Sequence, residues 1–280
     1  EPSVISFSGG RTSAYMLHRV LDAYDGDLPD HIKVCFANTG REMPETLDFV
    51  RDCSENWGVD ITWLERYAEV APEGHKNKFI YTTKVVDYDT AARDGEPFLD
   101  LLKARRYAPN PVARFCTVEL KIRPIKDWLI QQGWETPYLG FIGIRADEQR
   151  RAAKMHGTIE SGQERYLPLW LDKITKKDIF KFWSENTFDL GLPNNNGVTD
   201  WGNCDLCFLK GLSKKMAIIR ERPTLADWWI RAEKQFSQRV GNGRFFRDDQ
   251  PSYEDMKVIA TSQSSFDFGF DETIPCFCGD

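Results

Sequence analysis

The sequence has no long apolar run, and that absence is the first limit on the class of protein. None of its hydrophobic stretches approaches the roughly 20 residues that a membrane-spanning helix requires. No signal-peptide pattern opens the chain either. We therefore expect a cytoplasmic protein that does not enter a membrane. Internal repeats and low-complexity segments are also lacking, which leaves one globular chain of 280 residues, long enough to bury a sizeable core without disulfides.

An excess of positive charge is missing as well. The formal net charge is −6, whereas a dedicated duplex-DNA-binding protein is usually basic. Three short basic clusters do occur, at residues 103–106, 150–151 and 210–215. Each cluster is either a solvated face or part of a pocket for an anionic substrate.

Histidine is scarce, and its four copies show no ligand spacing. The seven cysteines are more informative, because an odd count without a secretory signal favours a reducing compartment and metal or redox chemistry. Cys204 and Cys207 form a C-x-x-C pair, and Cys116 precedes them. Thiolates in such a pattern bind zinc or an iron–sulfur cluster, and spacing alone does not choose the metal. Cys35, on an apolar strand, and Cys53, on a helix, are expected to be structural.

The first 65 residues alternate between apolar strands and amphipathic helices. Residues 4–7, 32–37 and 60–65 are short apolar runs that predict buried strands. Apolar side chains recur between them at helical spacing, at Leu17, Val20, Leu21 and Tyr24 and again at Met43, Leu47, Val50 and Trp57. This order, with short connections, predicts a doubly wound, Rossmann-like α/β fold with a parallel sheet and right-handed crossovers. Residues 138–145 are expected to add a later strand to the same sheet.

The remaining segments are less regular. Residues 66–113 depart from the strand–helix rhythm and predict an insertion of mixed structure. A helix is predicted over residues 175–186, where Thr175 is the N-cap and Asp178, three residues on, is placed for a capping box. Further along, residues 191–203 predict a loop, residues 225–236 a helix, and residues 239–271 an ordered loop or a mobile tail. We expect residues 1–220 to form the main domain, with residues 221–280 adding a helix and a cysteine-bearing tail packed on it.

A glycine-rich stretch joins the first strand to the first helix. Gly9 and Gly10 let the backbone approach a ligand closely, and free N–H groups at a helix N-terminus bind anions. The surrounding side chains add hydroxyl donors and one positive charge, from Ser6, Ser8, Thr12, Ser13 and Arg11. A second polar segment, at residues 37–46, follows the next strand. Because parallel strands deliver their carboxyl ends to one edge, both loops are expected to face the same ligand.

Five motifs, in order along residues 4–210, resemble those of the phosphoadenosine phosphosulfate (PAPS) and adenosine phosphosulfate (APS) reductases of the PP-loop superfamily. They are "SFSGGRTS" (6–13), "NTGREMPET" (38–46), "RFCTVELKIRP" (114–124), "GIRADEQRR" (143–151) and "LPLWLDKITKKDIFKFW" (167–183). The resemblance implies an adenine nucleotide with its phosphates on the loop from Ser8 to Ser13. It places Asn38, Thr39 and Gly40 near the adenosine, and it implies that Lys121, Arg145 and Arg151 bind phosphate or sulfate oxygens.

The resemblance also bears on the cysteines. APS-type reductases hold a 4Fe–4S cluster on four cysteines, and Cys116, Cys204 and Cys207 match three of them. Phe115 stands where the family has the remaining ligand, so the fourth is expected from the C-terminal "PCFCGD". Our hypothesis is that Cys276 is this ligand and that Cys278 is the catalytic nucleophile of the family's mobile tail. The swapped assignment, an open three-cysteine iron site and a terminus without a role stay open, and the resemblance favours iron–sulfur over zinc.

Two reactions fit these motifs. In the first, a thiolate attacks the sulfur of a bound sulfonucleotide, releases AMP or its 3′-phosphate, and a thioredoxin-like thiol reductant then frees sulfite. In the alternative, "SGGRTS" resembles the loop of ATP pyrophosphatases, some of which use a cluster to transfer sulfur to tRNA or DNA. Thr12 stands where that loop usually has Asp, and the acidic net charge also disfavours nucleic acid as a partner. A nucleotide-binding protein without turnover is a third interpretation, and the oligomeric state, including a homodimer, is left open.

Overall fold

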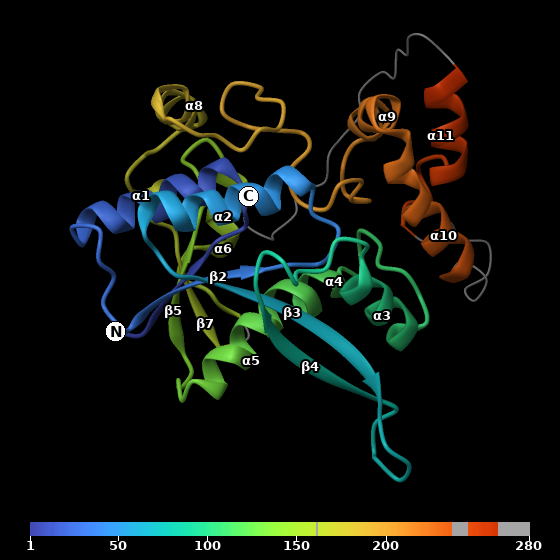
Figure 1. Cartoon of the computed structure of the whole chain (residues 1–280), viewed down its shortest axis with the longest axis horizontal. Helices are drawn as coiled ribbons and strands as arrows, with labels where there is room; N and C mark the ends of the chain where they lie inside the picture. Colours follow the sequence, from blue (N-terminus) through green and yellow to red (C-terminus); the bar gives the residue numbers. More distant parts are fainter. Residues whose placement is uncertain (161, 237–245, 263–280) are drawn as a thin grey trace.

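We describe the chain from a computed structural model, which covers residues 1–160, 162–236 and 246–262. A seven-stranded sheet forms its centre, in the order β4-β3-β2-β1-β5-β7-β6 (Figure 1). The strands are β1 (Ser3–Ser6), β2 (Ile32–Ala37), β3 (Ile61–Val70), β4 (Phe79–Val86), β5 (Tyr138–Ile142), β6 (Ile159–Glu160) and β7 (Gln163–Tyr166). The five central strands pair in parallel, and the two edge strands β4 and β6 are antiparallel to their neighbours. The predicted α/β fold with a parallel sheet is therefore confirmed.

Helices cover both faces of the sheet. Those of the first two thirds of the chain are α1 (Arg11–Ala23), α2 (Pro44–Trp57), α3 (Glu96–Arg105), α4 (Phe115–Thr117), the π-helical turn η1 (Val118–Ile122), α5 (Arg123–Gln131), α6 (Gln149–Met155), α7 (Pro168–Leu171) and α8 (Lys176–Glu185). In Figure 1, α1 and α2 lie on one side of the sheet and α5 on the other. Within the strands, Ile5 and Val34 join the core under α1 and α2, whereas Val4 and Cys35 join the core under α5. This alternation follows from the period of two in a strand.

Beyond residue 210, helices form a lobe of their own beside the sheet (Figure 1). They are α9 (Leu212–Glu221), the 3₁₀ turn η2 (Pro223–Leu225), α10 (Ala226–Phe236) and α11 (Tyr253–Ser262). The expectation of a loop or tail over residues 239–271 was wrong for α11. Its buried residues Tyr253, Met256 and Ala260 are spaced at i, i+3 and i+7, which is too sparse a stripe to stand out in a polar segment.

Local signals account well for the other elements. Thr175 and Asp178 form the expected capping box at α8. The mixed structure expected over residues 66–113 is a hairpin of β3 and β4 followed by α3. Tyr24, expected on the buried face of the first helix, is 42% exposed because α1 ends at Ala23. In the part of the chain that the structure covers, no helix is both long enough and apolar enough to cross a membrane.

Candidate anion and nucleotide site

The loop after β1 closes on itself through hydroxyl groups. Ser13 Oγ accepts a hydrogen bond from the Ser8 backbone N–H at 3.2 Å, lies 2.9 Å from Ser8 Oγ and donates to the Gly10 carbonyl at 3.0 Å. Gly9 has a φ of 76°, and a Cβ there would lie 2.6 Å from the Thr46 side chain. The backbone therefore turns sharply between strand and helix, at the N-terminus of α1, where a helix favours an anion.

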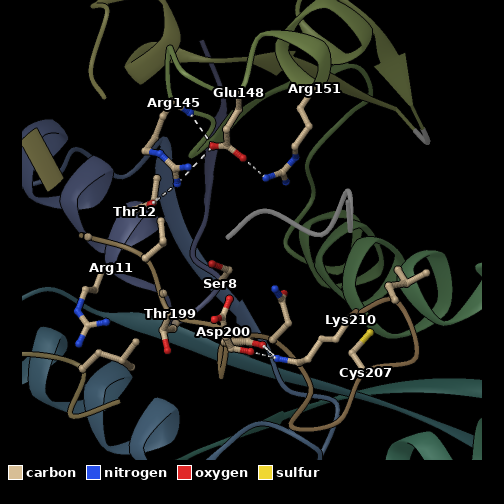
Figure 2. Close-up of a pocket in the computed structure, with 18 of the residues that line it drawn as sticks. Ser8, Arg11, Thr12, Arg145, Glu148, Arg151, Thr199, Asp200, Cys207 and Lys210 are labelled. Atoms are coloured by element: carbon tan, nitrogen blue, oxygen red, sulfur yellow. Dashed lines mark hydrogen bonds and ion pairs between the residues drawn. The ribbon is translucent and has the colours of Figure 1, made fainter. Parts of the chain in front are cut away.

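A cavity of about 630 Å³ opens over this loop (Figure 2). Three segments far apart in the sequence line it: residues 8–12, residues 145–151 and residues 197–214. Two of the three basic clusters belong to its wall, because Arg150 and Arg151 and the lysines Lys210 and Lys214 line it. For these clusters the anion-pocket interpretation agrees with their position in the structure.

The arginine wall carries the predicted anion ligands Arg145 and Arg151. Both side chains are more than nine-tenths buried. Arg145 Nη1 donates to Thr12 Oγ1 at 3.2 Å, which ties this wall to the glycine loop.

Asp147 Oδ1 and Oδ2 accept from Arg145 Nε and Nη2 at 3.1 and 3.3 Å. Burial acts against ionisation of Asp147, but the Arg145 guanidinium outweighs it and lowers the pKa of this carboxyl. Glu148, for which the sequence predicted no role, bonds both arginines.

Arg11 makes contacts that the sequence did not predict. It lines the cavity, but its Nε and Nη2 donate to the Asp189 carboxylate, both at 2.6 Å, and Nη2 also reaches the Leu192 carbonyl at 2.8 Å. Figure 2 shows its side chain directed away from Arg145. Arg11 therefore anchors the segment after α8, and only its buried Nη1 lacks a hydrogen-bond partner.

A smaller cavity of about 60 Å³ adjoins the large one, since Ser8 lines both. It lies at the carboxyl ends of β1, β2 and β5, marked by Ser6, Ala37 and Ile142. Half of its twelve lining residues have apolar side chains, and the other half have polar ones. These are Ser6, Ser8, Lys121, Tyr138, Gln163 and Arg165.

Residues 38–40, after β2, are buried and line neither of these cavities. Asn38 Nδ2 donates to Glu65 Oε1 at 2.6 Å and to the Ala92 carbonyl at 2.9 Å. Thr39 donates through its backbone and hydroxyl to the Glu42 carboxylate. These contacts brace the loop, and the position of residues 38–40 near the adenosine stays a prediction. No local signal could have identified Glu65 as the partner, because it lies 27 residues further along.

One of the cysteines predicted as metal ligands lines the large cavity. It is Cys207, whose backbone N–H donates to the Cys204 carbonyl at 3.2 Å. Burial raises the pKa of the Cys116, Cys204 and Cys207 thiols, that of Cys116 to about 12. Among the described residues, however, no three His, Cys, Asp or Glu side chains form a group that could hold a metal ion. Cys276 and Cys278 lie outside the described residues, so the described ones alone do not complete such a site.

An ion pair and hydrogen bonds between buried residues hold the C-x-x-C loop in place. Asp205, between the two cysteines, forms an ion pair with Arg41 and accepts from Trp229 Nε1 at 2.7 Å. The Tyr253 hydroxyl donates to the Leu206 carbonyl at 2.7 Å. Burial outweighs Arg41 and raises the pKa of Asp205. The C-terminal helices therefore fix the position of Cys207 in the cavity wall.

Taken together, a parallel α/β sheet, a glycine loop entering a helix and arginines facing that loop define a PP-loop type of nucleotide site. Comparison with known proteins agrees: residues 2–189 match the phosphoadenosine phosphosulfate reductase domain, and the chain belongs to this family.

Three uncharacterized relatives are similar to this chain. It is 33% identical over 214 residues to a nin region protein of Escherichia phage lambda, covering 76% of this chain and 67% of that protein. It is 26% identical over 258 residues to a protein of Methanocaldococcus jannaschii, covering 87% and 44%. It is 27% identical over 174 residues to a 37.8 kDa protein of Escherichia phage 186, covering 55% and 50%. The match thus spans about half the length of the last two.

Proposed function

We propose that the chain is a sulfonucleotide reductase-like enzyme that binds an adenine nucleotide across the two cavities. The observation that carries the proposal is the meeting of the glycine loop, Arg145, Arg151 and Cys207 around one cavity. Arginine forks and loop N–H groups suit a phosphate or sulfate dianion. Cys207, in the same wall, is a predicted cluster ligand, and the proposed nucleophile, Cys278, belongs to the C-terminal segment.

The smaller cavity is our candidate for the adenine subsite. It adjoins the large cavity at Ser8, which places a partly apolar space beside the phosphate loop. Nucleobases are bound in such spaces by apolar faces and a few polar groups. The volume, about 60 Å³, implies that side chains such as Lys121 and Arg165 move when the base enters.

The pairing of the carboxylates favours a sulfonucleotide over ATP. All three carboxylates that line the large cavity have cationic partners: Asp147 and Glu148 pair with arginines, and Asp200 Oδ1 lies 2.7 Å from Lys214 Nζ. Mg²⁺, which accompanies ATP in most enzymes, is usually held by one or two carboxylates as well as by the phosphates. A sulfonucleotide, whose anionic oxygens would bind the arginines directly, fits this wall better than ATP with its Mg²⁺ ion.

The proposed reaction is nucleophilic displacement at sulfur. The thiolate of Cys278 attacks the sulfonucleotide sulfur, an S–S bond forms, and the bond from sulfur to the phosphate oxygen breaks, so AMP or its 3′-phosphate leaves. A thiol reductant then attacks the cysteine sulfur and releases sulfite. The cavity residues bind and orient the nucleotide in this scheme, and no step passes through a metal cluster.

The test is turnover by full-length protein purified without oxygen. Protein is incubated with PAPS, APS or ATP and dithiothreitol, and sulfite, nucleotide and pyrophosphate are measured. We expect sulfite from PAPS or APS, and its loss in Cys278→Ser but not in Cys53→Ser, whose thiol is buried in the core. Pyrophosphate from ATP without sulfite, or full activity of Cys278→Ser, would overturn the proposal; the first result would favour the pyrophosphatase alternative.

A further inference from the structure

Glu148 lies between the two arginines of the cavity wall (Figure 2). Its Oε1 bonds Arg151 Nη1, and its Oε2 lies 3.4 Å from Arg145 Nη1 and accepts from the Arg145 backbone N–H at 3.0 Å. The Glu148 side chain is 13% exposed and lines the cavity with both partners. One carboxylate thus bridges two guanidinium groups that line the cavity with the glycine loop.

The Arg145 guanidinium has partners besides Glu148. Asp147 binds the other edge of the Arg145 guanidinium through two hydrogen bonds, and Thr12 accepts a further one. Placement of the Arg145 guanidinium alone therefore does not require the Glu148 carboxylate. A carboxylate also presents two oxygens to nitrogen donors, as phosphate and sulfate do.

We propose that Glu148 is an internal competitor for the anion, whose carboxylate takes the place of phosphate or sulfate oxygens at Arg145 and Arg151. The inference rests on the anion-binding part of the proposed function. A ligand must displace Glu148 from both arginines, so weakly charged anions gain little from the site. A dianionic group on a nucleotide has enough charge to displace Glu148. The bridge from Arg145 through Glu148 to Arg151 therefore selects for highly charged ligands.

The test compares anion affinity in the wild type and Glu148→Gln by isothermal titration, with inorganic pyrophosphate and APS as probes. Removing the competing charge is expected to tighten pyrophosphate binding by about tenfold, the low end of what a hydrogen bond to a charged group contributes. A purely structural role predicts weaker binding, so the sign of the change decides. The gain is expected to shrink at high salt.

Asp172→Asn is the matched control, since it removes one charge from an exposed pair with Arg19 outside the cavity. We expect no tightening there. Glu148→Ala is measured in parallel, so that the result does not depend on how the glutamine amide is turned. Weaker or unchanged affinity in folded variants overturns the inference, and so does failure of both to fold, because Glu148 would then be a structural requirement. If the wild type binds neither probe, the proposed function fails instead.

Discussion

Gly9 shows how one residue joins the fold to the site. Its positive φ lies in a region that only glycine enters at little cost, and the Thr46 side chain fills the space where a Cβ would be. Two independent constraints therefore act on one position. The sharp turn they permit places Ser8 and Thr12 at the cavity floor.

Gly9→Ala is expected to lower the free energy of unfolding by about 2 kcal/mol, because backbone strain and the close Thr46 contact add together. Gly26→Ala is the control: Gly26 has a φ of 86°, but no atom lies within 4 Å of the position that an added methyl group would take. Gly26→Ala introduces backbone strain without a steric clash, and it is expected to lower the free energy of unfolding by about 1 kcal/mol. Chemical denaturation of both variants checks this. Equal losses would show that the Thr46 contact relaxes without cost.

Local pattern identified the residues of the glycine loop but not their partners. Gly9, Ser8 and Thr12 were predictable because a strand, two glycines and a helix follow each other directly in the chain. Arg11 was expected to face an anion, yet it binds Asp189, which lies 178 residues away. Asn38, expected near the adenosine, likewise donates a hydrogen bond to a distant residue, Glu65. A single sequence does not specify which of several acceptors a buried donor meets.

At the scale of elements, the start of α8 is fixed by reciprocal hydrogen bonds. Asp178 Oδ2 accepts from the Thr175 backbone N–H at 2.8 Å and from its hydroxyl at 2.7 Å. The bonds from Thr175 lower the pKa of Asp178. The sequence alone was sufficient to predict this helix start, because Thr175 and Asp178 lie within one helical turn.

Asp178→Asn is expected to cost about 1 kcal/mol of unfolding free energy at neutral pH, the usual contribution of a cap. The folded-state pKa is lowered, so the carboxylate stabilises the protein above its unfolded pKa, roughly 4. That contribution is lost as the pH falls through the folded pKa. Denaturation curves of both proteins between pH 7 and pH 3 should therefore converge toward acid. The exposed Asp30→Asn serves as the control, and a difference independent of pH would contradict the assignment.

The helix α11 was not predicted, yet it contributes to the candidate site. Tyr253 is 1% exposed, and its hydroxyl donates to the Leu206 carbonyl within the C-x-x-C loop. Burial raises the pKa of this phenol well above its usual value, so it stays a donor. Tertiary packing on α9 and α10, rather than a strong amphipathic pattern, explains why this helix forms.

Tyr253→Phe removes that donor and leaves a buried carbonyl without it. We expect a loss of roughly 1–2 kcal/mol in unfolding free energy. Tyr24→Phe, at an exposed position, should change little. Faster alkylation of Cys207 in native Tyr253→Phe than in the wild type would indicate that the hydroxyl holds the loop. An unchanged alkylation rate would limit its role to stability.

At the scale of the whole molecule, three parts of the chain meet at one edge of the sheet. The glycine loop comes from the first strand, the arginine wall from the segment after β5, and the cysteine loop from the entry to the helical lobe. Strand order explains the first two, since β1 and β5 are neighbours. The third depends on long-range packing around Asp205 and Trp229, which is why its position relative to the phosphate loop was not predictable.

The iron–sulfur cluster stays a prediction. It can be tested through the cysteines that are expected to bind it. The described residues, Cys116, Cys204 and Cys207 among them, form no group able to hold a metal. A fourth ligand from the C-terminal segment would complete the set. We expect protein purified without oxygen to be brown, with about four irons and four sulfides per chain.

Serine variants of individual cysteines then test which thiols hold the metal. Cys204→Ser and Cys276→Ser should lose the colour and the iron, whereas Cys53→Ser and Cys278→Ser should keep both. Loss in Cys278→Ser with retention in Cys276→Ser would exchange the roles of the two tail cysteines. Colourless wild-type protein with one zinc, or with no metal, would contradict the cluster. The buried, protonated thiols would then be core residues, and a nucleophile would have to come from the C-terminal segment.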